Sequence, residues 1–189
     1  MATPRKPTQA EIQAAIGRTV PDIIAPDLRV LFCGINPSLY SAAVGHHFAR
    51  PGNRFWPTLH AAGFTDRLVA PFEDDELLQL GYGITNVVDR ATATADALTA
   101  EELVVGGQSL AAKVQQYRPQ FLAILGIGAY RTAFKQPKAG VGRQPKTLHN
   151  AILWVLPNPS GLNAHYQLQD LARVFRELLV AVEHTDNKA

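Results

Sequence analysis

The chain has 189 residues, of which 18% are charged and 47% hydrophobic. This balance is typical of a globular protein and excludes an intrinsically disordered one. The formal net charge is only +2 and the sequence pI is near 8.8. Because no long block of like charge occurs, this mild basicity permits a polyanionic partner without requiring one.

Cys33 is the single cysteine, which excludes an intrachain disulfide, a structural zinc site and a four-cysteine iron–sulfur cluster. Its place in an apolar run favours a buried core residue over a nucleophile. No run approaches the ~18 apolar residues of a membrane span, and the N-terminus lacks the apolar core of a signal peptide. We therefore expect a soluble, cytoplasmic protein that contacts no membrane. We also expect a monomer.

The chain divides into residues 1–21, a tail with a short helix, residues 22–184, one domain, and residues 185–189, a polar tail. Thr8 and Glu11 form a capping box that predicts a helix through Ile16.

Four short runs within the domain have the apolar or β-branched content of strands. They are residues 30–33, 83–88, 121–125 and 151–156. Helical patterns lie between and after them, at residues 55–62, 73–80, 99–117 and 168–182. The segments 36–53, 91–98 and 135–150 read as loops. This alternation predicts an α/β fold, a mostly parallel sheet with helices on both faces.

Three of the strands end in small or polar loops, which a parallel sheet gathers at one edge, where ligands bind in such folds. The first loop contains Asn36, which Pro37 holds in an extended conformation. The other two begin at Gly126 and Asn158. The alternative for Asn36-Pro37 is a simple turn.

Several common motifs are absent: His-Glu-x-x-His, Gly-x-Ser-x-Gly and a Walker loop. The pair Gly126 and Gly128 resembles a dinucleotide fingerprint, but Arg131 stands where the third glycine belongs. His46 and His47 have no further ligands at metal-binding spacing, so solvated loop histidines are favoured over a metal site.

The remaining residues suggest recognition of a planar base. The Asn36 amide can donate and accept hydrogen bonds, but it cannot act as a strong general base near pH 7. Phe48, in a glycine-rich loop, could stack on a ring, and Leu162 could insert between base pairs. Each residue alone is more often structural.

Four ordered motifs make a more specific case. They are Gly34-Ile-Asn-Pro37, the run from Phe48 to Trp56, the run from Gly83 to Arg90, and Leu156-Pro-Asn-Pro-Ser-Gly-Leu162. Together they resemble the mismatch-specific uracil/thymine DNA glycosylases of the uracil-DNA glycosylase superfamily, over residues 22–182. The resemblance implies a three-layer α/β/α fold with a four-stranded, mostly parallel sheet.

By this resemblance, Asn36 positions the hydrolytic water, and Phe48 stacks on the flipped base. Ile35 and Phe48 read the pyrimidine through backbone groups, while the pocket near Ser41 sets the base range. Residues that approach DNA or form the wedge are Asn158, Ser160, Gly161, Leu162 and Asn163. The resemblance implies no metal and no cofactor.

Two positions depart from bacterial relatives. Asn86 stands where they carry Lys, and Ala164 where they carry Arg, so weaker phosphate or orphan-strand contacts are expected. His165 could compensate or be a plain loop histidine. Asp89 could be a second catalytic carboxylate or, as we favour, a salt-bridge partner of Arg90.

The function expected from the sequence is therefore a monofunctional DNA glycosylase. It would excise uracil, and by extension thymine or other damaged pyrimidines, from G:U mismatches in double-stranded DNA. The reaction would be hydrolysis of the N-glycosidic bond after base flipping, as a step of base excision repair. The rivals are a non-catalytic DNA-lesion-binding protein with the same fold and a small-nucleotide-binding α/β protein.

Overall fold

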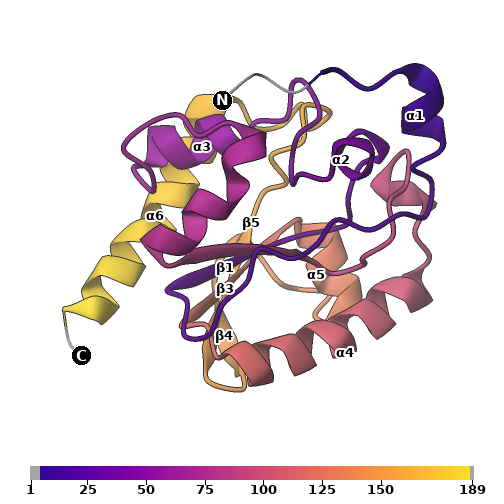
Figure 1. The fold of residues 1–189 in the computed structure, drawn as a ribbon. Coiled ribbons are helices and arrows are strands. Elements are labelled where there is room, and N and C mark those ends of the chain that lie inside the picture. Colours follow the sequence, from indigo (N-terminus) through magenta and orange to yellow (C-terminus); the bar gives the residue numbers. More distant parts are fainter. Residues whose placement is uncertain (1–4, 188–189) are drawn as a thin grey trace.

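Two layers of helices enclose a twisted sheet in the computed structural model (Figure 1), which describes residues 5–187. Predictions for residues 1–4 and 188–189, parts of the two expected tails, lie outside the described residues. The elements in chain order are α1 (Gln9–Gln13), β1 (Val30–Gly34), α2 (Leu39–Val44), α3 (Phe55–Ala62), the 3-10 helix η1 (Pro71–Leu80), β2 (Tyr82–Asn86), the 3-10 turn η2 (Ala95–Ala97), α4 (Ala100–Tyr117), β3 (Phe121–Leu125), α5 (Ile127–Ala133), β4 (Gly142–Leu148), β5 (Ala151–Leu156) and α6 (Leu168–Asp186).

Within the described residues the sheet has five strands, in the order β2-β1-β3-β5-β4. The first four in this order pair in parallel, and β4 pairs antiparallel with β5. The α/β class is therefore confirmed, but the four-stranded sheet is wrong. The missed strand β4 has the sequence Gly-Arg-Gln-Pro-Lys-Thr-Leu, mostly exposed, so it shows none of the apolar pattern that reveals a buried strand. Such an edge strand tolerates proline and charge.

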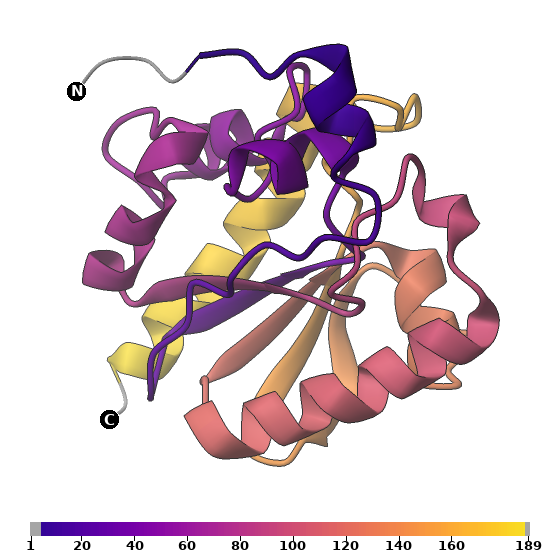
Figure 2. The same cartoon turned by 45° about the vertical axis from the view of Figure 1, so that its right-hand side comes forward.

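Successive side chains of the strands point to opposite faces of the sheet and contribute to two hydrophobic cores, one on each face. Val30 and Phe32 point to the layer of α3, η1 and α6, while Leu31 and Cys33 point to the layer of α4. Figure 2 shows these helix layers on opposite sides of the sheet. All five residues of β1 are buried, as the continuous apolar run predicts for a central parallel strand.

The helix α2 was not predicted from the sequence, because it is only six residues long and lies in a polar loop. Its signal is Ser38, whose hydroxyl accepts from the Ser41 amide at 3.1 Å as an N-cap. Gly45 ends the helix with φ 78°, a conformation that favours glycine. No helix among the described residues is both long and apolar enough to cross a membrane.

Candidate active site

A cavity of about 330 Å³ opens at the carboxyl edge of the sheet, where β1, β2, β3 and β5 end. It brings together most of the residues that the sequence singled out: Ile35, Asn36, Ser41, Phe48, Asn158, Ser160, Leu162 and Asn163. Gly161 and Asp89 do not line it. Arg50 and Asp96 are the charged residues of the lining, so the cavity carries little net charge.

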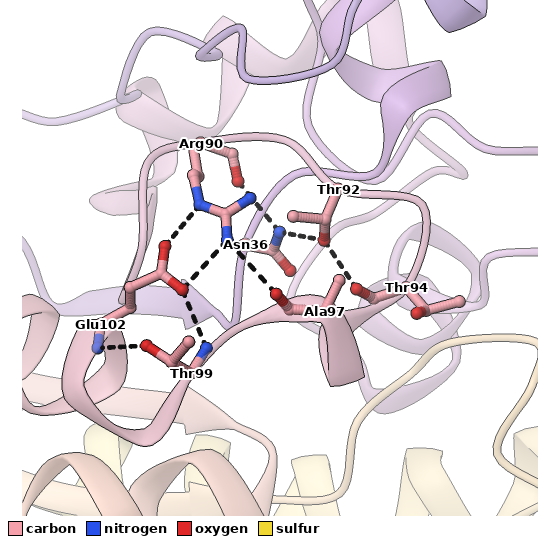
Figure 3. Close-up of polar contacts among 7 residues, drawn as sticks. All are labelled: Asn36, Arg90, Thr92, Thr94, Ala97, Thr99 and Glu102. Carbon is pink, nitrogen blue, oxygen red and sulfur yellow. Dashed lines mark hydrogen bonds and ion pairs between the residues drawn. The ribbon is translucent and has the colours of Figure 1, made fainter.

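The side chain of Asn36 is held from one side only. Its Nδ2 donates to the Arg90 carbonyl at 3.0 Å and to the Thr92 hydroxyl at 2.7 Å, and Figure 3 shows both bonds. A carbonyl can only accept, so the amide nitrogen must face Arg90. No described residue donates to Oδ1, which is therefore available to accept a hydrogen bond from a molecule in the cavity.

The segment that orients Asn36 is itself braced. Thr92 Oγ1 donates to the Thr94 carbonyl at 2.7 Å, so its proton is already used. The Arg90 guanidinium forms an ion pair with Glu102, at 2.5 and 3.0 Å. This arginine, together with the Thr99 amide, lowers the pKa of the Glu102 carboxyl to about 2, so the pair stays charged at neutral pH (Figure 3).

Asp89 has a different partner from the one the sequence suggested. Its carboxylate lies 3.4 Å from Lys113 Nζ, which also contacts Asp22 at 2.7 Å. Arg90 pairs with Glu102 instead. With its carboxylate outside the cavity lining, Asp89 is placed for a structural ion pair.

Phe48 has a left-handed backbone, with φ 53°, which is uncommon for a bulky residue and marks stored strain. Bonds to both neighbours hold it there. The buried Asp74 carboxylate accepts from the His47 amide at 3.1 Å, Trp56 Nε1 donates to the His47 carbonyl, and Ser41 Oγ accepts from the Ala49 amide. One face of the Phe48 ring stacks on Phe55 with centroids 4.1 Å apart.

These contacts also correct the expectation that His46 and His47 are solvated loop histidines. Asp74, in the first turn of η1, is only 4% exposed and anchors the Phe48 loop. His47 is buried and its Nε2 donates to the Pro21 carbonyl at 2.8 Å, while His46 contacts Asp74. Among residues 5–187 no group of three or more His, Cys, Asp or Glu side chains is arranged to hold a metal. Burial raises the pKa of the Cys33 thiol, which makes it a poor nucleophile.

Asn86 is a cavity residue that the sequence reasoning assigned elsewhere. It ends β2, is 4% exposed and lines the cavity. A Cβ added to Gly34 would lie 2.6 Å from Asn86 Oδ1 and 3.2 Å from Phe48 Cζ. Asn86 thus lies beside the Phe48 ring, which argues against a phosphate contact at position 86. Asn86 lies there because it stands opposite Gly34 in the parallel pair of β1 and β2, a register that the sequence does not reveal.

The predicted wedge loop, residues 158–166, is tied to the body of the protein by Arg54, which the sequence reasoning missed. The guanidinium donates to the carbonyls of Ser160 at 2.5 Å and Asn163 at 2.9 Å, and also to those of Pro159 and Tyr166. Asn163 and Asn158 add bonds within the loop. Leu162 is 69% exposed at its tip, and Gly161 packs so closely on Gly52 that an added Cβ would lie 2.6 Å from the Gly52 carbonyl oxygen.

Comparison with known proteins agrees with this geometry. The family model described as "Uracil DNA glycosylase superfamily" matches residues 21–179, most of the chain. The chain belongs to the uracil DNA glycosylase superfamily. A structure titled "Solution NMR Structure of a putative Uracil DNA glycosylase from Methanosarcina acetivorans" shares 20% sequence identity, with a TM-score of 0.55 over 87% of this chain and 99% of that one. At this identity, the second comparison supports the fold alone.

Members of the uracil DNA glycosylase superfamily are DNA glycosylases, hydrolases that bind DNA. The described cavity is consistent with this class, because it combines an oriented amide, an aromatic ring and an exposed loop at one sheet edge. Of the two glycines Gly126 and Gly128, only Gly126 has a packing role in this fold, because a Cβ on Gly128 would meet nothing within 4 Å. A Cβ on Gly126 would lie 3.0 Å from Ile35 Cδ1, so the glycine makes room for a cavity residue.

Proposed function

We propose that this protein is a monofunctional DNA glycosylase that removes uracil from G:U mismatches by hydrolysing the N-glycosidic bond of a flipped nucleotide. The observation that carries the proposal is the orientation of Asn36, whose Nδ2 is fixed by Arg90 and Thr92 while Oδ1 stays available in the cavity. The four motifs that resemble the mismatch-specific family support the substrate. Thymine and other damaged pyrimidines are further candidate bases.

In the proposed reaction, Asn36 Oδ1 accepts a hydrogen bond from the attacking water. This bond orients the water so that a lone pair of the water oxygen points at C1′. As the new C1′–O bond forms, the C1′–N bond breaks and uracil leaves as an anion. The amide cannot take the water's proton near pH 7, so this proton passes to bulk water and the amide contributes orientation rather than base catalysis. The braced segment that carries Arg90 and Thr92 supplies the required rigidity.

Negative charge builds on the leaving uracil as the glycosidic bond breaks. The backbone amides of Ile35 and Phe48 have no acceptor among the described residues, so both can donate to the base oxygens. Donors that are already in place stabilise such charge without reorganisation. Phe48 would cover one face of the base, and the Asn86 amide would meet its edge as both donor and acceptor.

Extrusion of a base costs a few kcal/mol, and less for a mispaired one. We propose that Leu162 fills the gap left in the stack, with Asn158, Ser160, Gly161 and Asn163 against the backbone and the unpaired guanine. The enzyme would thus select a mismatched pair partly because its base leaves the duplex more easily than a base in a normal pair. A DNA substrate would place the protein inside the cell, and one copy of the chain would suffice.

The test is a panel of duplexes that carry G:U, A:U, G:T or normal pairs, together with a single strand that contains uracil. Free base is measured directly, and abasic sites are cleaved with alkali. We expect uracil release that is fastest from G:U. Binding to mismatched DNA without release of any base would instead favour the lesion-binding alternative, and indifference to all DNA would contradict both.

A further inference from the structure

The positive charge of the chain is distributed very unevenly. All 16 acidic residues lie outside residues 103–169, a stretch that nevertheless contains seven basic ones. These are Lys113, Arg118, Arg131, Lys135, Lys138, Arg143 and Lys146. The net charge of +2 therefore conceals a strongly basic segment.

Two of the seven are neutralised locally, because Lys113 pairs with Asp22 and Asp89, and Arg118 pairs with Asp27. The other five form what we call the basic edge: Arg131, Lys135, Lys138, Arg143 and Lys146. All five are exposed, and none has a carboxylate partner among the described residues. Elsewhere the basic residues are mixed: Arg5, Arg29, Arg67, Arg90 and Arg173 form ion pairs, whereas the exposed Arg18 and Arg50 have no carboxylate partner among residues 5–187. The basic edge differs from these in having five such residues within 16 positions of the sequence.

The basic edge has a defined shape. The Arg131 guanidinium donates twice to the Ala139 carbonyl, at 3.0 and 2.7 Å. Gln144, itself buried, donates to the carbonyls of Gly140 and Gly142 at 2.9 Å each. These bonds fold residues 136–146 around a surface pocket with a volume of about 430 Å³. The residues that line this pocket include Lys138, Arg143 and Lys146.

The position of this surface links it to the candidate active site. Gly142 pairs with Val155 and Arg143 with Trp154, one and two residues before β5 ends at Leu156. The chain then enters the wedge loop that lines the cavity. Arg143 thus lies beside the strand end from which the wedge loop leaves, and Lys146 lies further along the same outer strand of the sheet.

We propose that the basic edge is a second DNA-contact surface, which binds the sugar–phosphate backbone of the same duplex beyond the nucleotides at the cavity. This inference rests on the proposed function, because it assumes that a duplex is bound at the wedge loop. Unpaired cations release counterions when they meet phosphates, so such contacts strengthen binding without regard to sequence. A lysine on an edge strand can instead serve only to prevent strand pairing between molecules.

The test compares two triple variants of equal charge in a duplex-binding assay at several salt concentrations. The first, Lys138→Gln with Arg143→Gln and Lys146→Gln, removes charge from the basic edge. The matched control, Arg67→Gln with Arg118→Gln and Arg173→Gln, removes three exposed arginines that already pair with carboxylates. Circular dichroism and size-exclusion chromatography check that both variants remain folded and unassociated.

Each lost phosphate contact should reduce the slope of log K against log salt by about 0.9. Between 50 and 200 mM salt, the affinity of the wild type should therefore fall about 40-fold more than that of the basic-edge variant, if all three residues contact phosphates. The control should keep most of the wild-type slope. Shortening the duplex to the region of the cavity should remove the difference between the wild type and the basic-edge variant.

Equal slopes for the two triple variants would overturn the inference and leave the basic edge as protection against strand pairing or a source of general charge. If the wild type releases uracil in the same experiments, the proposed function stands regardless. A wild type that releases no base from any duplex contradicts the proposed function, while the difference in slopes still decides whether the basic edge binds DNA.

Discussion

Replacing Arg54 by alanine tests how the wedge loop is held in place. The guanidinium reaches four backbone carbonyls of residues 159–166, and no carboxylate pairs with it in the described chain. Without these bonds the loop must be ordered each time DNA binds. We expect duplex processing to suffer while the cavity residues on β1 stay in place.

The magnitude follows from the contacts. A hydrogen bond from a charged donor contributes ~1.5–3 kcal/mol. Because Arg54 is only partly buried and water can replace it, we take about half the lower value for each bond, a total of about 3 kcal/mol. This corresponds to a loss of roughly 150-fold in kcat/KM on a duplex. The Arg54→Lys variant keeps the charge but not the planar fork, so an intermediate loss is expected.

The assay measures kcat/KM for a G:U duplex and for single-stranded uracil DNA, with hydrogen exchange of residues 157–166 in parallel. Arg176→Ala is the matched control, since Arg176 also donates to a backbone carbonyl, that of Ala62 at the end of α3, but to none of the loop. Arg54→Ala should lower the duplex-to-single-strand ratio and speed exchange in the loop, and Arg176→Ala should change neither. If the duplex-to-single-strand ratio and the exchange of the loop are both unchanged in Arg54→Ala, Arg54 does not hold the wedge loop in place.

Three further predictions each concern one residue: Thr92, Leu162 or His47. Thr92→Val removes the hydroxyl that accepts from Asn36 Nδ2 at 2.7 Å. Uracil release should become about tenfold slower, which corresponds to ~1.4 kcal/mol on the barrier, while KM stays unchanged. A normal rate would mean that the Arg90 carbonyl alone fixes the amide. Leu162→Ala should slow duplex processing more than single-strand processing, and an equal effect on both would argue against a wedge. Burial lowers the pKa of His47 below its usual 6.5, so its protonation favours the unfolded chain. Neutral His47 therefore contributes its full stability above about pH 6.5, and this stability is lost as the pH falls. Between pH 7 and 5 the melting temperature of His47→Gln should drop less than that of the wild type. Identical pH profiles of the two proteins would contradict this.

The parts of the site that follow local rules could be predicted from the sequence. A buried apolar run that ends in Gly34 and is followed by Asn36-Pro37 places an amide at the carboxyl edge of a sheet, and the structure has it there. The capping box of Thr8 and Glu11 also forms as predicted, although the helix that it opens ends at Gln13 rather than at Ile16. These features depend on residues three or four positions apart.

The parts that were missed depend on contacts between distant segments. Arg54 looks like an ordinary surface arginine until the loop more than 100 residues later folds over it. Asn86 faces the cavity because β2 pairs in register with β1, which composition does not reveal. The edge strand β4 lacks an apolar face, so hydrophobic periodicity could not distinguish it from a loop.

If Asn36 orients the hydrolytic water, its replacement must slow the chemical step itself. The single-turnover rate of uracil release from a G:U duplex by Asn36→Ala measures that step. Gln108→Ala, an exposed change on α4, is the control. We predict a loss of at least ~100-fold for Asn36→Ala, with duplex affinity and melting temperature close to those of the wild type. Release at the wild-type rate by a folded Asn36→Ala protein would contradict the account.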